Sequence, residues 1–188
     1  MDLPSRRNQL KQATAAAHQS LDDLIGDFDS EQAYRRYLVG MARFRLPIDA
    51  WLGTQAMPVE LEDWRPGIYD REMRQDLTDL DLDIPEPMHP FAPPPGNGLL
   101  GLLYVLEGSA LGARLLAKRA EKLGYTDCFA ARHLFSQARN LSNWPAFSSR
   151  MERVCVYDQQ AAAAWANTAF DYASRAFESA LDATLRNR

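Results

Sequence analysis

The sequence has few of the residues that build disulfide frameworks and zinc sites. Its 188 residues include two cysteines, Cys128 and Cys155, and three histidines. The cysteines form no CxxC pair, and histidine and cysteine do not cluster at the spacing of zinc ligands. We therefore expect no zinc site, and we interpret the cysteines as reduced thiols of a cytoplasmic protein.

An excess of positive charge is also missing. The formal net charge is −4 at pH 7, which argues against broad nucleic-acid binding, because that function usually requires a basic surface. The basic residues of the first twelve positions are followed by no apolar run of the signal-peptide type, so we expect no secretion signal. We expect no membrane span either, because Glu107 and Arg114 interrupt the apolar run well before the ~20 residues that a span requires.

Signals of β-structure are absent as well. No segment alternates β-branched and polar residues, and no internal repeat is visible. The length suits one domain with a substantial core, so we predict a single all-α domain over residues 1–188. The expected helices cover about 5–24, 30–53 with a kink near 43–44 caused by Pro47, 69–77, 98–124, 127–137, a segment starting at Ser142 or Asn143, and 158–185. The proline-rich stretch 83–98 is expected to be an extended surface connection.

What the sequence does contain is an unusual pattern of glycines within 98–124. At 100° per residue, Gly101, Gly108 and Gly112 fall on one narrow stripe of the expected helix. Each interior glycine costs roughly 0.5–1 kcal/mol relative to alanine. The stripe of bare backbone therefore predicts a close approach, either by another helix or by a flat ligand.

His18 differs from the other two histidines in its surroundings. It lies at the edge of the apolar stripe of the first expected helix, and Asp22 follows one turn later on the same face. Imidazoles that bind metals usually donate the proton of their second nitrogen to an oriented acceptor. The pattern is typical of a metal or haem ligand, with a histidine satisfied in the core as the alternative.

The remaining histidines are interpreted as surface or structural residues. His133 lies on an amphipathic segment, and His89 lies in the proline-rich connection. Glu86 and His89 spell ExxH, a pattern of di-iron helical bundles. The flanking prolines prevent a helix there and no second copy exists, so we expect no di-iron site. An imidazole on one helix and a glycine stripe on another instead favour a clamp around a macrocycle such as haem.

Three segments resemble the haem oxygenase family. LKQATAAAHQSLD, which contains His18, resembles the first helix of that family, where the histidine is the proximal haem ligand. GSALGA at 108–113 is similar to the glycine motif of its distal helix, and WANTAFDYASRAFESAL at 165–181 is similar to its closing helix. The variant LYVLEGSALGAR is most similar to bacterial members found with bacteriophytochromes, which need biliverdin as chromophore.

The resemblance implies a helical haem-oxygenase-like domain that holds haem between its first helix and its distal helix. It implies oxidative cleavage of haem, with dioxygen and external electrons, to biliverdin, carbon monoxide and ferrous iron. His18 would be the axial ligand of the iron, with Asp22 beside it, and Gly108 and Gly112 would lie over the distal face. Lys11 matches a family position that pairs with a haem propionate.

Two residues of the distal motif depart from the family pattern. Ser109 stands where many members have an aspartate that organises the waters of proton delivery. A hydroxyl can hold a water network but cannot supply the same negative field. Ala113 stands where many members have the second glycine of a GG pair, so its methyl is expected to reshape the pocket. Arg150 and Arg153 are further candidates for propionate partners.

The sequence implies an external electron donor, because it contains no flavin- or nicotinamide-binding motif. A ferredoxin or a flavin reductase is expected, and Lys118 and Lys122 match positions that form a reductase-docking surface in some relatives. A biliverdin-accepting phytochrome is a further expected partner. Two alternatives remain open: a non-catalytic haem carrier or sensor with the same clamp, and a helical scaffold without cofactor.

Overall fold

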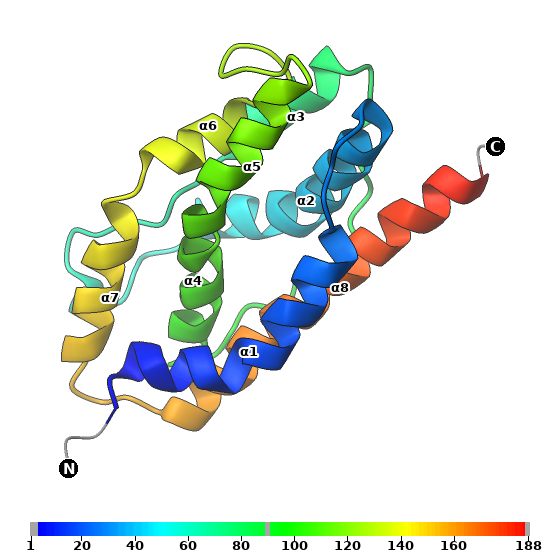
Figure 1. The fold of residues 1–188 in the computed structure, drawn as a ribbon. Coiled ribbons are helices and arrows are strands. Elements are labelled where there is room, and N and C mark those ends of the chain that lie inside the picture. The colour runs from blue at the N-terminus through cyan, green and yellow to red at the C-terminus, as the bar shows by residue number, and fades with distance from the viewer. Residues whose placement is uncertain (1–3, 89–90, 187–188) are drawn as a thin grey trace.

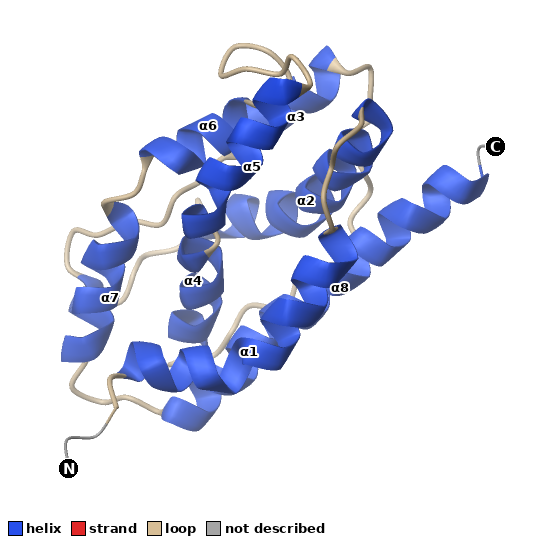
Figure 2. Ribbon diagram, viewed as in Figure 1, coloured by secondary structure: helices blue, strands red, loops and turns tan. Residues whose placement is uncertain are grey.

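The computed structural model describes residues 4–88 and 91–186, and within them the chain forms helices and no strand. The all-α prediction is confirmed. The elements in chain order are α1 (Arg6–Ile25), α2 (Glu31–Leu52), the short 3-10 helix η1 (Val59–Leu61), α3 (Asp70–Asp79), α4 (Gly98–Gly108), α5 (Ala110–Lys122), α6 (Arg132–Arg139), α7 (Asn143–Arg153) and α8 (Gln159–Arg186) (Figures 1 and 2).

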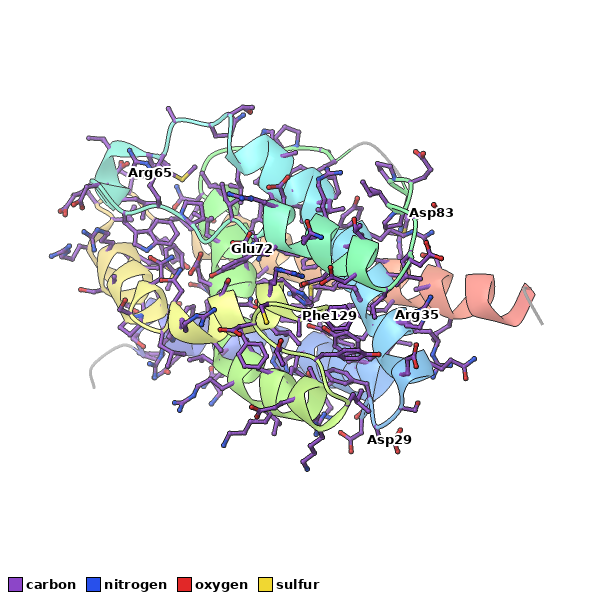
Figure 3. The ribbon with its side chains drawn as sticks, turned by 90° about the horizontal axis from the view of Figure 1, so that it is seen from above. Asp29, Arg35, Arg65, Glu72, Asp83 and Phe129 are labelled. Carbon is purple, nitrogen blue, oxygen red and sulfur yellow. The ribbon has the colours of Figure 1, made fainter. Side chains whose placement is uncertain are left out.

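The long helix α8 supports the helices on which the site is built. It packs against α1, α2 and α4, and in Figure 1 α1 lies along it while α4 and α5 lead away. Its buried face is built largely from alanines, which let neighbouring helices approach closely: Ala162, Ala166, Ala169, Ala173 and Ala176. Charged side chains lie around the outside, with Asp29, Arg35 and Asp83 towards one end of the molecule and Arg65 at the other (Figure 3).

The helix ends follow local sequence signals. The Ser5 hydroxyl accepts from the Asn8 amide at 3.3 Å at the start of α1, and Ser30 does the same for Ala33 at the start of α2. Asp158 accepts from the Ala161 amide at 3.0 Å before α8. Just beyond α5, Gly124 has a φ of 87°, the left-handed conformation common after a helix. The starts of α1, α2 and α8 thus match the predicted ones closely.

Two expected details are wrong. The helix predicted over 127–137 begins only at Arg132, because the preceding residues form a turn in which the Thr126 amide donates to the Phe129 carbonyl at 2.8 Å. The helix predicted over 98–124 is broken at Ser109, where the Gly112 amide bonds the Ser109 carbonyl three residues back. Pro47 lies inside α2, as the helix predicted over 30–53 requires, and the kink near 43–44 stays a prediction.

The glycine stripe divides into two parts with different surroundings. A Cβ at Gly101 would overlap the Ala162 carbonyl of α8, so the close approach there is helix against helix. A Cβ at Gly112 would meet no atom within 4 Å, and one at Gly108 would meet only the Trp144 ring, at 3.7 Å. The close approach of another helix is therefore confirmed at Gly101, and the approach of a flat ligand at Gly108 and Gly112 stays a prediction.

Taken across the break, Gly98–Lys122 is long and apolar enough to cross a membrane by length and composition alone. Half of its most apolar window is buried against the rest of the protein, and its mean hydropathy is 1.5. A largely buried core helix passes the same test, so this observation is weak evidence for a membrane span.

Alanine substitutions separate the two parts of the stripe. Gly101→Ala is expected to lower the free energy of unfolding by about 3 kcal/mol, because the added methyl meets main chain that cannot move aside. Gly112→Ala is expected to leave stability unchanged or raise it by up to about 1 kcal/mol, because only helix propensity changes. Urea denaturation of both variants measures the difference, and equal effects would contradict the division.

Candidate functional site

His18 presents an oriented imidazole on the surface of α1. Its Nδ1 lies 3.0 Å from Oδ2 of Asp22, and the two side chains are 62% and 58% exposed. The edge of the ring packs on Phe170 of α8, with centroids 5.7 Å apart. In the neutral tautomer that donates to Asp22, Nε2 carries the lone pair that a metal ligand needs. The exposure excludes the alternative of a histidine satisfied in the core.

Helices α1 and α4 approach each other one turn before His18 and Gly108. Thr14 is buried, and its hydroxyl donates to the Leu10 carbonyl at 2.8 Å. Burial raises the pKa of the Tyr104 phenol on α4, and a hydrogen bond with Thr14 acts in the opposite direction. From this contact the two helices diverge (Figure 1). His18 and Gly108 each lie one helical turn farther along their own helices.

The side of α5 that carries Gly112 is both bare and apolar. Leu111 and Leu115, one turn apart, are 57% and 56% exposed. Exposed leucines beside a glycine with open space above its backbone provide a flat apolar surface. An oriented imidazole and an apolar surface without side-chain obstruction suit a planar apolar ring that carries a metal ion. The residues present therefore fit a haem.

Ser109 marks the break between α4 and α5, and its hydroxyl contacts other parts of the protein. Oγ donates to the Leu106 carbonyl at 2.6 Å and accepts from Nε2 of Gln137 at 2.7 Å. The hydroxyl hydrogen is thus used within the protein, and a role of Ser109 in proton delivery stays a prediction. Ala113 is fully buried and packs with the core residues Ala117 and Leu134, so its methyl is not brought to the site.

The cationic side chains named from the sequence are distributed unevenly. Lys11 is exposed on α1, two turns before His18, and Lys118 and Lys122 are exposed on α5. Arg150 instead pairs with Asp63 at 2.8 Å and with Glu62 at 3.6 Å. Arg153 also contacts Glu62, at 3.7 Å. These contacts hold both arginines against the segment that contains η1, so their role as propionate partners stays a prediction without structural support.

Sequence reasoning missed the structural role of Glu107, which anchors the end of α4. Its side chain is buried, Oε1 accepts from the Gly67 amide at 2.8 Å, and Oε2 accepts from Nδ2 of Asn143 at 2.8 Å. The Gly67 carbonyl accepts from Arg45, which forms a buried ion pair with Asp49 at 2.8 Å. A lone carboxylate at the end of an apolar run was the available signal. This network fixes the residue that precedes Gly108.

His133 is the other histidine among the described residues, and its partner lies in the core. His133 is buried on α6, with Nδ1 2.7 Å from Oδ2 of Asp76, which agrees with its interpretation as a structural residue. His89 lies outside the described residues. Among the described residues, no group of three or more histidine, cysteine, aspartate or glutamate side chains is arranged to hold a metal ion. A metal at this site would have to arrive within a ligand that supplies most of its coordination.

Known proteins resemble this chain in sequence and in fold. No family model matches it. It is 26% identical over 161 residues to haem oxygenase PigA of Pseudomonas aeruginosa, which covers 82% of this chain and 81% of that protein. Its fold resembles that of the haem oxygenase from Neisseria meningitidis solved with NO and CO bound. The TM-score is 0.76 at 25% identity, over 95% of this chain and 92% of the other.

Burial of Glu107 predicts a pH dependence of stability. Burial raises the pKa of its carboxyl, with smaller opposing effects from Gly67 and Asn143. A carboxyl with a raised folded-state pKa contributes stability that is present below its ordinary value of 4.5 and is lost as pH rises through the folded-state pKa. The difference in unfolding free energy between wild type and Glu107→Gln is therefore expected to shift in favour of the variant as pH rises from about 4.5 to 7.5.

Urea denaturation of both proteins across this pH range measures the effect. Glu121→Gln makes the same charge change at an exposed position of α5 and serves as the matched control. A constant difference between wild type and Glu107→Gln, or one that favours the wild type as pH rises, would contradict the prediction.

Proposed function

We infer that this chain belongs to the haem oxygenase family and degrades haem, because it resembles two haem oxygenases in sequence and fold over most of its length. The observation that carries the inference within the chain is the presence of an oriented imidazole, His18 on α1, together with bare backbone at Gly108 and Gly112 on α4 and α5. The imidazole is oriented by Asp22, and a Cβ at Gly112 would meet no atom within 4 Å.

Bound haem supplies both the iron at which dioxygen reacts and the ring that is oxidised. The protein supplies position. We propose that Nε2 of His18 would hold the haem iron, because the hydrogen bond from Nδ1 to Asp22 fixes the tautomer and the orientation of the imidazole. The missing side chains of Gly108 and Gly112 would leave room for a small diatomic molecule. Leu111 and Leu115 provide apolar contact area for the ring.

Lys11 is the best-placed cation for an acidic substituent of haem. It lies seven residues before His18, which is about 10 Å along the same side of α1. Its side chain is exposed and a lysine ammonium can pair with a carboxylate without fixed geometry. We propose that it pairs with a haem propionate and so sets the rotation of the ring about the iron.

We further propose that the products are biliverdin, carbon monoxide and ferrous iron, and that dioxygen is the co-substrate. An external ferredoxin or flavin reductase would supply electrons, with Lys118 and Lys122 as its docking contacts, since both are exposed one turn apart on α5. The likeness of the distal motif to members found with bacteriophytochromes supports a phytochrome as the biliverdin acceptor. A cytoplasmic location agrees with these partners.

The first test follows haem binding and turnover in one optical experiment. Haemin added to the wild type is expected to give a Soret band, which bleaches in air with a reductant while a red-absorbing product grows. His18→Ala is expected to lose the wild-type complex, because the imidazole ligand is gone. Gln19→Ala, at the neighbouring exposed position, is the control and should behave as the wild type.

The other outcomes identify the alternatives. A complex that forms and persists with reductant in air would indicate a haem carrier or sensor and exclude turnover. A wild type that forms no complex, or a His18→Ala variant that binds and turns over haem normally, would show that the site is assigned wrongly.

Asp22 provides a second test of the same site. Asp22→Ala is expected to weaken haem binding by roughly ten- to a hundredfold, because the imidazole loses the acceptor that orients it. Asp23→Ala is the matched control: its carboxylate, one residue along, accepts from Gln19 at 2.8 Å on an exposed face. Difference titrations with haemin measure the affinity of both variants. An equal loss of affinity in the two would contradict the proposed role of Asp22.

A further inference from the structure

We propose that Gln137 of α6 is a positioning residue of the haem oxygenase reaction, which holds the break between α4 and α5 by binding Ser109. The proposal rests on the proposed function, because it concerns how the glycine backbone is presented to haem. It assigns a role to a residue that does not touch the substrate, and it is argued from contacts on the protein side of the distal helix.

The contact between Gln137 and Ser109 is short and half-buried. Gln137 is buried, and its Nε2 donates to the Ser109 hydroxyl at 2.7 Å. The hydroxyl in turn donates to the Leu106 carbonyl at 2.6 Å. Leu106 lies in the last turn of α4, where carbonyls lack partners within the helix. One side chain of α6 is therefore linked, through one hydroxyl, to the end of α4 at the residue where the helix changes direction.

Helix α6 is itself fixed from a third helix. Its first residue has no side-chain cap of its own. Asp76 of α3, fully buried, instead accepts from the backbone amides of Arg132 at 2.9 Å and His133 at 3.0 Å, and from the His133 ring at 2.7 Å. Gln137 lies one turn after His133 on the same face. The donor that holds Ser109 is thus anchored to α3.

This arrangement determines which atoms of the distal helix face haem. The Ser109 hydroxyl is directed towards Leu106 and Gln137, so the surface offered to the substrate is the backbone at Gly108 and Gly112. Without the donor from Gln137, the hydroxyl is free to change rotamer, and one of the contacts that hold α5 at its angle to α4 is lost. Gln137 therefore fixes the distance of the bare backbone from the haem ring.

Amide hydrogen exchange in the protein without haem tests the structural half of the proposal. Gln137→Leu is expected to speed exchange at residues 106–112 by roughly tenfold, because the hydrogen bond that holds Ser109 at the break is lost. Ser109→Ala removes the same hydrogen bond at its exposed partner and is expected to speed exchange equally. This second variant provides the test if Gln137→Leu folds poorly. Arg139→Ala, an exposed site on α6 paired with Asp127, is the control.

A double-mutant cycle tests whether the effect passes through Ser109. In the Ser109→Ala background, Gln137→Leu is expected to add less than about a twofold change in exchange, because the shared contact is already gone. Additive effects of the two substitutions, or unchanged exchange in Gln137→Leu, would overturn the proposal.

The reaction half is read from the haem complex. Gln137→Leu is expected to bind haemin as the wild type does, because His18 is untouched, and to change the ratio of biliverdin isomers formed in turnover. An unchanged isomer ratio overturns the role of Gln137 and leaves the proposed function intact. A wild type that binds no haem overturns the proposed function, and the positioning role with it, whatever the exchange data show.

Discussion

The contact between Gly101 of α4 and the Ala162 carbonyl of α8 is the constraint on which the site depends. No side chain of Gly101 separates the two backbones, so α4 approaches α8 closely there. Helix α8 also receives α1, where Asn167 donates to the Ala13 carbonyl at 3.3 Å and Phe170 packs on the His18 ring. The two helices of the site, α1 and α4, are therefore both positioned by α8. Small residues that tolerate little change form these contacts.

A second layer of support is electrostatic and lies behind the break. Glu107 binds Gly67 and Asn143, and the buried Arg45–Asp49 pair holds Gly67 from its other side. Burial raises the pKa of both carboxyls, which is the cost of placing such groups inside the protein. Removal of one partner would leave a buried charge unpaired. Glu107, at the end of α4 just before the break, is thus held in place by the segments that contain Gly67 and Asn143, with the Arg45–Asp49 pair of α2 behind Gly67.

How much the sequence revealed depended on whether the deciding interaction was local. The starts of α1 and α2 could be predicted because Ser5 and Ser30 bind amides three residues away. The break at Ser109 could not, because it is stabilised by Gln137 from another helix. The late start of α6 is only partly local, since a turn at 126–129 precedes it and Asp76 of α3 caps it. An interaction between residues far apart in the sequence produces no periodic pattern from which it could be predicted.

The same distinction holds within the candidate site. His18 and Asp22 are one turn apart, so their pairing was visible in the sequence, and the structure has them 3.0 Å apart. Gly101 and Gly112 are alike in the sequence, and only the position of α8 separates a packing glycine from an open one. Arg150 was named for its charge, but its acidic partners near η1 depend on the fold.

Helices α1 and α4 both pack on α8. The separation of the His18 imidazole from the glycine backbone therefore depends on how these three helices pack. Ala162 and Ala166 are both inaccessible to solvent, and their small side chains set how far α1 and α4 lie from each other. A single methylene group added at Ala162 or Ala166 would tilt α1 or α4 and change the distance between the two helices. Variation in α8, far along the chain from His18 and Gly108, is thus a route by which evolution can change the separation of α1 and α4.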